Sequence, residues 1–123
     1  MIAFYIFMLA CDLMIPAIML FFGYRWQKKP PKEINAGYGY RTRRSMSSKK
    51  AWNFAHVIFG KQWIKLGWAT LVVTLAVMVP LAFFTLEINT VATVGFIIAF
   101  LQLIPMIVPI FSTERALKRE FGI

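Results

Sequence analysis

The side chains that most often do chemistry in proteins are few in this sequence and lie far apart. Its 123 residues include one histidine, His56, and one cysteine, Cys11. The five carboxylates are scattered along the chain at Asp12, Glu33, Glu87, Glu114 and Glu120. Nucleophilic catalysis and metal binding both need several such groups at a recognisable spacing, and no such spacing occurs here. We therefore expect neither an enzyme nor a bound cofactor or metal.

One carboxylate, Asp12, lies at the centre of an apolar run over residues 2–22. A charge at that position in a membrane helix costs about 2.5–3.5 kcal/mol on insertion scales, so it is a functional candidate. If the apolar runs cross a membrane in alternating directions, Thr74 and Gln102 lie at a similar depth. The sequence thus predicts an intramembrane polar cluster. Its carboxylate would either bind a proton, a cation or the cationic part of a peptide, or be protonated or hydrogen-bonded to a neighbour and only fix packing.

The elements that must position these residues are three apolar runs of 21 residues each, over residues 2–22, 66–86 and 91–111. At 1.5 Å per residue such a run spans roughly 31 Å, which matches a hydrocarbon core of about 30 Å. The composition is 59% hydrophobic and 15% charged, which excludes an ordinary soluble domain of this size. We predict an all-α integral membrane protein with one domain, three transmembrane helices and a hairpin turn at residues 87–90.

The basic residues predict the orientation of these helices. Eleven of the 14 Lys and Arg lie between Arg25 and Lys65, and the other three follow the third run. Lys and Arg concentrate in cytoplasmic loops. We therefore expect an outside N-terminus, a cytoplasmic loop at residues 24–65 and a cytoplasmic tail at residues 112–123. The net charge of +9 then describes an inner membrane face in contact with anionic lipid and not a nucleic-acid binder.

The second half of the loop has the periodicity of an amphipathic helix. Trp52, Ala55, His56, Phe59 and Trp63 recur on one helical face, and no proline or glycine interrupts residues 49–59. We predict a short interfacial helix that lies on the inner leaflet and leads into the second span after the glycine at position 60.

The loop also carries the sequence that identifies a family. Gly39-Tyr40-Arg41-Thr42, Arg44-Ser45-Met46 and the run Trp52-Asn53-Phe54-Ala55-His56 with Gly60-Lys61 resemble the SdpI family of bacterial membrane proteins, named for immunity to a sporulation-delaying toxin. The resemblance implies a multi-pass plasma-membrane protein that protects its bacterium from a secreted membrane-active peptide toxin. It also implies signalling, in which a cytoplasmic repressor is held at the membrane. The namesake type has additional spans before the shared region, so this chain corresponds to a three-span form.

The resemblance makes the loop the candidate functional surface. Its candidate residues are Asn35, Gly39, Tyr40, Arg41, Thr42, Arg44, Ser45, Met46, Trp52, Asn53, Ala55, His56 and Gly60. Two alternatives remain open. A small membrane protein could bind an anionic lipid or a lipid phosphate through Arg41, Arg43, Arg44, Lys49 and Lys50. A proton-linked transporter subunit centred on Asp12 would require a homo-oligomer, because three helices barely enclose a pathway.

Overall fold

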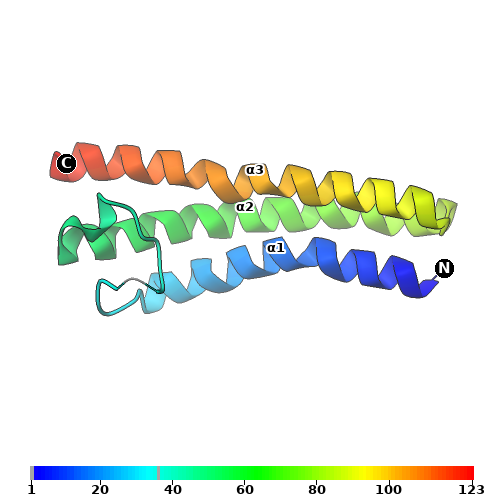
Figure 1. Cartoon of the computed structure of the whole chain (residues 1–123), viewed down its shortest axis with the longest axis horizontal. Helices are drawn as coiled ribbons and strands as arrows, with labels where there is room; N and C mark the ends of the chain where they lie inside the picture. The colour runs from blue at the N-terminus through cyan, green and yellow to red at the C-terminus, as the bar shows by residue number, and fades with distance from the viewer. Residues whose placement is uncertain (1, 36) are drawn as a thin grey trace.

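The protein is a bundle of three long helices that lie side by side (Figure 1). The computed structural model describes residues 2–35 and 37–123, with α1 over Ile2–Lys28, α2 over Lys49–Phe84 and α3 over Ile88–Phe121. A short 3-10 helix, η1, occupies Ser45–Ser47. All three long helices are apolar enough and long enough to cross a membrane. The predicted all-helical fold with three spans is confirmed.

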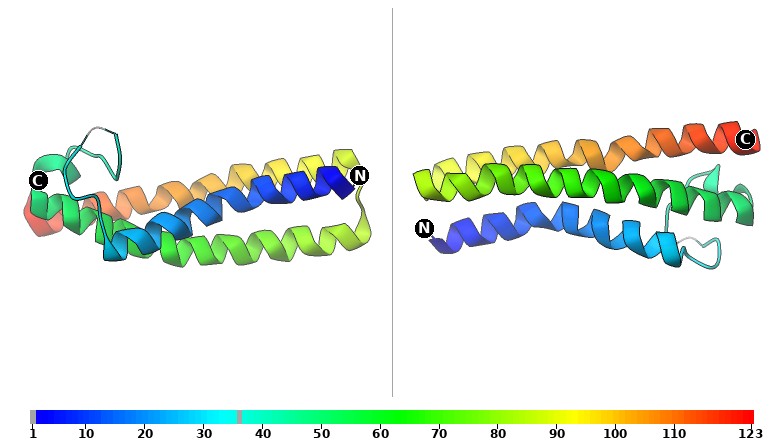
Figure 2. Two further views of the ribbon diagram at one scale, coloured as in Figure 1. Left: turned by 90° about the horizontal axis from the view of Figure 1, so that it is seen from below. Right: turned by 180° about the vertical axis from the view of Figure 1, so that it is seen from behind.

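The two ends of the bundle differ. One, here called the hairpin end, holds the start of α1 and the turn between α2 and α3; the other, the capped end, holds the loop between α1 and α2 and the end of α3 (Figure 1). At the capped end α2 and α3 continue past the end of α1 (Figure 2). With 36 residues against 27, α2 is longer than α1 by about 13 Å at 1.5 Å per residue. The loop packs against the helix surface that the shorter α1 leaves uncovered.

The prediction of a separate interfacial helix before the second span is wrong, because these residues belong to α2. Residues 49–59 form the first three turns of α2, which runs without a break through Gly60 and into the apolar segment. Gly60 is not a break because it lies at the crossing with Gly23 of α1. A Cβ atom on Gly23 would come within 2.9 Å of the Gly60 carbonyl oxygen, so small residues are needed where the two backbones approach.

Side-chain caps explain where α2 and α3 begin. The Ser48 hydroxyl oxygen accepts a hydrogen bond from the Ala51 N–H at 3.0 Å, which starts α2. The Glu87 carboxylate accepts from the N–H groups of Asn89 and Thr90, which starts α3. The Thr90 hydroxyl also donates to this carboxylate. Its bond is the largest cause that holds the pKa of the Glu87 carboxyl below its usual range, and the two N–H bonds lower this pKa further.

Two predicted boundaries need correction. The turn expected at residues 87–90 is shorter and lies earlier, because α2 ends at Phe84 and α3 begins at Ile88. Residues 112–121, expected to be a tail, continue α3 as far as Phe121, where Gly122 ends the helix in a left-handed conformation.

Apolar side chains form two buried clusters and an exposed belt. The buried cluster at the hairpin end contains Tyr5, Met8, Met78 and Val91. The cluster at the capped end contains Trp26, Tyr40, Ala51, Ala55, Phe59 and Leu117. Outside these clusters large apolar side chains face outward; Phe84 is 86% exposed and Phe100 is 71% exposed. Such an outer surface suits a lipid environment and not water.

Candidate functional site

The loop between α1 and α2 folds over the capped end and is bound there by Tyr40. We call its described residues, 29–35 and 37–48, the loop cap. The main-chain N–H of Tyr40 donates to Nε2 of His56 on α2 at 2.8 Å, and its hydroxyl donates to Oε2 of Glu114 on α3 at 2.6 Å. Its ring packs on that of Phe59, with 4.7 Å between ring centroids. Tyr40 therefore joins α2 to α3 beyond the end of α1.

The Tyr40 hydroxyl remains a hydrogen-bond donor over any physiological pH. Burial raises its pKa well above the usual range, and the hydrogen bond to the Glu114 carboxylate and the charge of that group raise it further. The Glu114 carboxylate is consequently held by a neutral phenol that has no tendency to ionise.

His56 serves as a support for the loop cap. Its Nδ1 lies 2.7 Å from the carbonyl oxygen of Trp52 and its Nε2 accepts from Tyr40. The two partners fix the neutral tautomer with the proton on Nδ1, because a carbonyl can only accept and a main-chain N–H can only donate. The indole N–H of Trp52 in turn donates to the carbonyl oxygen of Pro31 at 2.8 Å. Both ring nitrogens of His56 are used within the protein.

Gly39 allows this close contact between the loop and α2. Its φ of +114° is in the region that L side chains rarely adopt. A Cβ atom at this position would lie 2.7 Å from His56 Nε2 and 3.1 Å from the ring of Trp52. Only glycine satisfies the backbone conformation and the available space together.

Hydrogen bonds within the loop cap shape the turn that precedes α2. The Ser45 hydroxyl donates to the Tyr40 carbonyl oxygen at 2.8 Å, and its oxygen accepts a hydrogen bond from the Thr42 N–H at 2.9 Å. The Ser45 N–H donates to the Thr42 hydroxyl oxygen at 3.1 Å. Earlier in the loop, the Asn35 side-chain oxygen accepts from the N–H groups of Gly37 and Tyr38. These bonds give both halves of the cap a defined shape.

Glu114 on α3 is the residue at which the loop cap converges. Besides Tyr40 it accepts the Thr42 hydroxyl at 2.9 Å, and its Oε1 lies 3.4 Å from Arg44 Nη1 in an ion pair. Arg44 also donates through Nε to the main-chain oxygen of Ile123 at 2.7 Å. Glu114 was absent from the candidates that the sequence supplied. The available signal was a lone carboxylate one turn beyond the third apolar run, facing a basic loop.

The predicted loop residues divide into interior and surface groups. Buried in the interior are Tyr40, Ser45, Trp52, Ala55, His56 and Gly60. Partly buried are Asn35, Gly39, Thr42, Arg44 and Asn53. Exposed are Arg41 and Met46, together with Arg43, Lys49 and Lys50. Most members of the first two groups bond or pack within the capped end, and the third group is exposed on its surface.

The predicted intramembrane residues meet in the middle of the bundle. The Gln102 amide nitrogen donates to the main-chain oxygen of Asp12 at 2.7 Å and to the Thr74 hydroxyl oxygen at 2.9 Å. All three residues are buried. Both carboxylate oxygens of Asp12 and the amide oxygen of Gln102 lack a hydrogen-bond partner among the described residues. The cluster therefore presents acceptors without donors, an arrangement that suits a proton or a donor-bearing ligand. Its function stays a prediction.

The fold and the sequence together define the class and the family of this protein. Three apolar helices with a structured cap at one end define a multi-pass membrane protein. The sequence model of the SdpI/YfhL protein family matches residues 32–113, which is 82 of the 123 residues. The match includes the loop cap from residue 32 onward, all of α2 and most of α3. The chain therefore belongs to the SdpI/YfhL protein family.

One curated relative and the solved structures complete the comparison. A stretch of 27 residues is 67% identical to the uncharacterized protein YfhL of Bacillus subtilis (strain 168), covering 22% of this chain and 24% of that protein. The aligned stretch thus spans about a quarter of the relative's length. No solved structure matches the chain.

Proposed function

We propose that this chain is an SdpI-type immunity protein of the bacterial plasma membrane, which protects its cell from a secreted membrane-active toxin. We further propose that it binds a cytoplasmic regulator through the loop cap and the adjoining first turn of α2. The observation that carries the proposal is the extent of the family match, because residues 32–113 include most of the loop cap, all of α2 and most of α3.

The proposed orientation places the capped end in the cytoplasm and the hairpin end outside. All basic residues of the sequence lie between Arg25 and Lys65 or after the third apolar run, both toward the capped end. The turn at the hairpin end carries one charged residue, Glu87. This asymmetry is the one that the distribution of Lys and Arg in membrane proteins favours.

The regulator we propose has an acidic surface. Lys49 and Lys50 are exposed in the first turn of α2, which contains no acidic residue, and Arg43 is exposed in the cap. Cations at a helix N-terminus oppose the helix dipole and cost about 0.3–1 kcal/mol each. Their position is unfavourable for the isolated helix and favourable for attracting an anionic partner.

The toxin would meet the chain within the bilayer. A groove of about 340 Å³ lies between α2 and α3, with apolar walls that include Val73, Val77 and Leu101. Thr74 and Gln102 of the polar cluster also line it, so an apolar peptide in the groove would lie beside the polar cluster. The loop cap is bonded to α2 through His56 and to α3 through Glu114. A peptide that spread α2 from α3 would therefore strain the cap and signal to its outer surface.

Deletion and replacement of the gene test the proposal. Loss of the gene should make the cells more sensitive to the toxin in a producer culture's supernatant, and an unchanged killing curve would contradict an immunity role. The regulator is tested with the double variant Lys49→Gln/Lys50→Gln. The matched control is Lys61→Gln/Lys65→Gln, which removes two exposed lysines farther along α2. Only the first variant should abolish the transcriptional response to toxin, measured by RNA sequencing, and equal responses from both would exclude the cationic first turn of α2 as the regulator site.

A further inference from the structure

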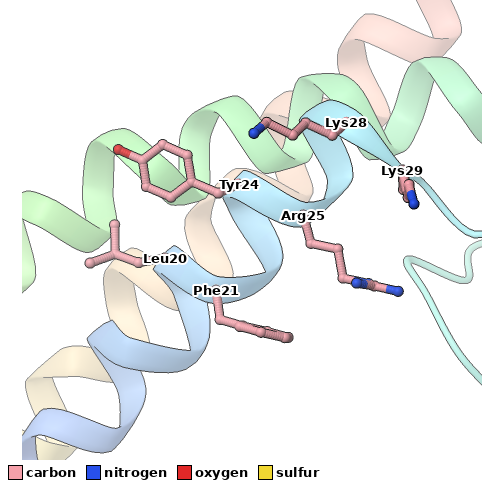
Figure 3. A pocket seen from close by; sticks show the side chains of 6 residues that line it. All are labelled: Leu20, Phe21, Tyr24, Arg25, Lys28 and Lys29. Atoms are coloured by element: carbon pink, nitrogen blue, oxygen red, sulfur yellow. The ribbon is translucent and has the colours of Figure 1, made fainter.

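A second feature of the capped end lies on the outer face of α1. Two rows of side chains, Leu20-Tyr24-Lys28 and Phe21-Arg25-Lys29, line a groove of about 720 Å³ along the last turns of this helix. Figure 3 shows Leu20, Tyr24 and Lys28 directed to one side of the helix and Phe21 and Arg25 to the other. The groove is apolar where it begins, at Leu20 and Phe21, and cationic where it ends.

The three cations of this groove carry more charge than the helix end requires. A helix C-terminus is equivalent to roughly −0.5 elementary charge, whereas Arg25, Lys28 and Lys29 supply three positive charges within about two turns. No carboxylate of the described residues forms an ion pair with any of them. The surplus positive charge is therefore available to an anion from outside the chain.

The depth of the groove indicates where that anion comes from. The first apolar run ends at residue 22, so Leu20 and Phe21 lie at the edge of the hydrocarbon and the cations lie one to two turns beyond it. Between them, the exposed Tyr24 hydroxyl accepts the indole N–H of Trp68 on α2 at 2.9 Å. Paired Tyr and Trp side chains of this kind are typical of the headgroup level of a bilayer.

We propose that this groove is a binding site for an anionic phospholipid. The phosphate lies by Arg25 and Lys29, in the same row as Phe21, which is 61% exposed and lies beside the first part of an acyl chain. Lys28, on the other side of the helix, adds to the local positive charge. A cationic end joined to an apolar groove matches both parts of such a molecule, whereas a soluble phosphate would use only the first. This site is separate from the five basic residues of the loop and of the start of α2 that the sequence suggested for lipid binding, and it does not depend on the proposed immunity function.

Native mass spectrometry of the full chain in a mild detergent tests the site, with phosphatidylglycerol as the probe and phosphatidylcholine as the neutral comparison. Each basic residue near a membrane surface is worth roughly a factor of five in affinity, so Arg25→Gln/Lys28→Gln/Lys29→Gln should weaken retention of phosphatidylglycerol on the order of 100-fold. The control Arg115→Gln/Lys118→Gln/Arg119→Gln removes the same charge from the exposed face at the end of α3. It should leave retention within about threefold of the unchanged protein, because these three residues do not contact the proposed site. The expected loss is thus smaller than the factor of about five for one basic residue that does.

Three outcomes would overturn the proposal. Equal losses in the two triple variants would show attraction to surface charge in general. Equal retention of phosphatidylcholine would show that the anionic headgroup is not recognised, and displacement by soluble glycerol phosphate would show an anion site without a lipid component. If the α1 triple variant fails to fold by circular dichroism, the pair Lys28→Gln/Lys29→Gln, outside the apolar run, is compared with Lys118→Gln/Arg119→Gln by the same measurement.

Discussion

Replacing Gly39 by alanine should detach the loop cap without unfolding the bundle. An L residue in a left-handed backbone conformation costs roughly 1–2 kcal/mol. The added Cβ atom would lie 2.7 Å from His56 Nε2, so the Tyr40 N–H bond to that nitrogen must break. Loss of such a bond costs about 0.5–1.5 kcal/mol. Together these terms favour opening of the cap by about 1.5–3.5 kcal/mol.

Limited trypsin digestion measures this opening, because Arg41 and Arg43 lie within the cap. When opening is fast relative to cleavage, the rate follows the population of the open form. A change of about 1.5–3.5 kcal/mol therefore raises the cleavage rate at these arginines roughly 10- to 400-fold. Cleavage within the membrane helices should not change, since they keep their own contacts.

Two other glycines provide controls for this experiment. Gly122 also has a positive φ, +68°, but a Cβ atom there would have no neighbour within 4 Å. Gly122→Ala thus tests the backbone conformation alone and should not affect cleavage in the cap. Gly37 lies in the cap, where a Cβ atom would have one contact, at 3.9 Å from the Asn35 side-chain oxygen. If Gly39→Ala is cleaved within about fivefold of Gly37→Ala, a gap of about 1 kcal/mol, the role assigned to Gly39 is refuted.

Three further substitutions have expected outcomes. Glu114→Gln keeps an acceptor for the cap but loses the partly exposed ion pair with Arg44, so the trypsin rate should rise about two- to fivefold, as about 0.5–1 kcal/mol implies. Lys49→Gln/Lys50→Gln should stabilise α2 by about 0.5–1.5 kcal/mol, seen as a higher unfolding midpoint in detergent, because both cations oppose the helix dipole. Asp12→Asn removes a buried carboxylate that has no donor among the described residues and should stabilise the bundle by about 1 kcal/mol; an unfolding midpoint below that of the unchanged protein would show that the carboxylate has a stabilising partner.

The sequence predicted well what depends on local pattern. Three runs of apolar residues matched to bilayer thickness predicted three long helices, and the structure confirms them. The 3.6-residue period predicted that Trp52, Ala55, His56, Phe59 and Trp63 share one apolar face. The first four are buried, and Trp63 is partly buried. Periodicity does not reveal what covers such a face. We expected the inner leaflet, whereas the loop cap covers part of it through Tyr40.

The helix ends were the weakest part of the prediction for a physical reason. Hydropathy reports where a helix meets lipid and not where its backbone hydrogen bonds stop, so α2 begins 17 residues before the apolar run at residues 66–86. Glycine normally weakens a helix, and Gly60 was read as a boundary. Its partner Gly23 lies 37 positions away in the chain, so the contact that keeps the helix intact could not be seen locally.

The positions of Asp12, Thr74 and Gln102 within their apolar runs were sufficient to predict that these residues lie at a similar depth in the membrane. They did not predict which atoms form hydrogen bonds. Gln102 binds the main chain of Asp12 and leaves the carboxylate without a donor, a distinction that depends on side-chain geometry. Glu114 was missed for a related reason. Its three partners in the loop lie 70 to 74 positions earlier in the chain, so its place just beyond the third apolar run did not show which residues it binds.

A killing curve tests the immunity role most directly. A strain that lacks this gene is complemented with the unchanged chain, with Gly39→Ala or with Gly122→Ala, and is exposed to supernatant from a toxin-producing culture while membrane levels of each protein are measured. We expect the unchanged chain and Gly122→Ala to restore survival and Gly39→Ala to restore little of it. Survival that is the same with and without the unchanged chain, at equal toxin and confirmed membrane insertion, would contradict the proposed function.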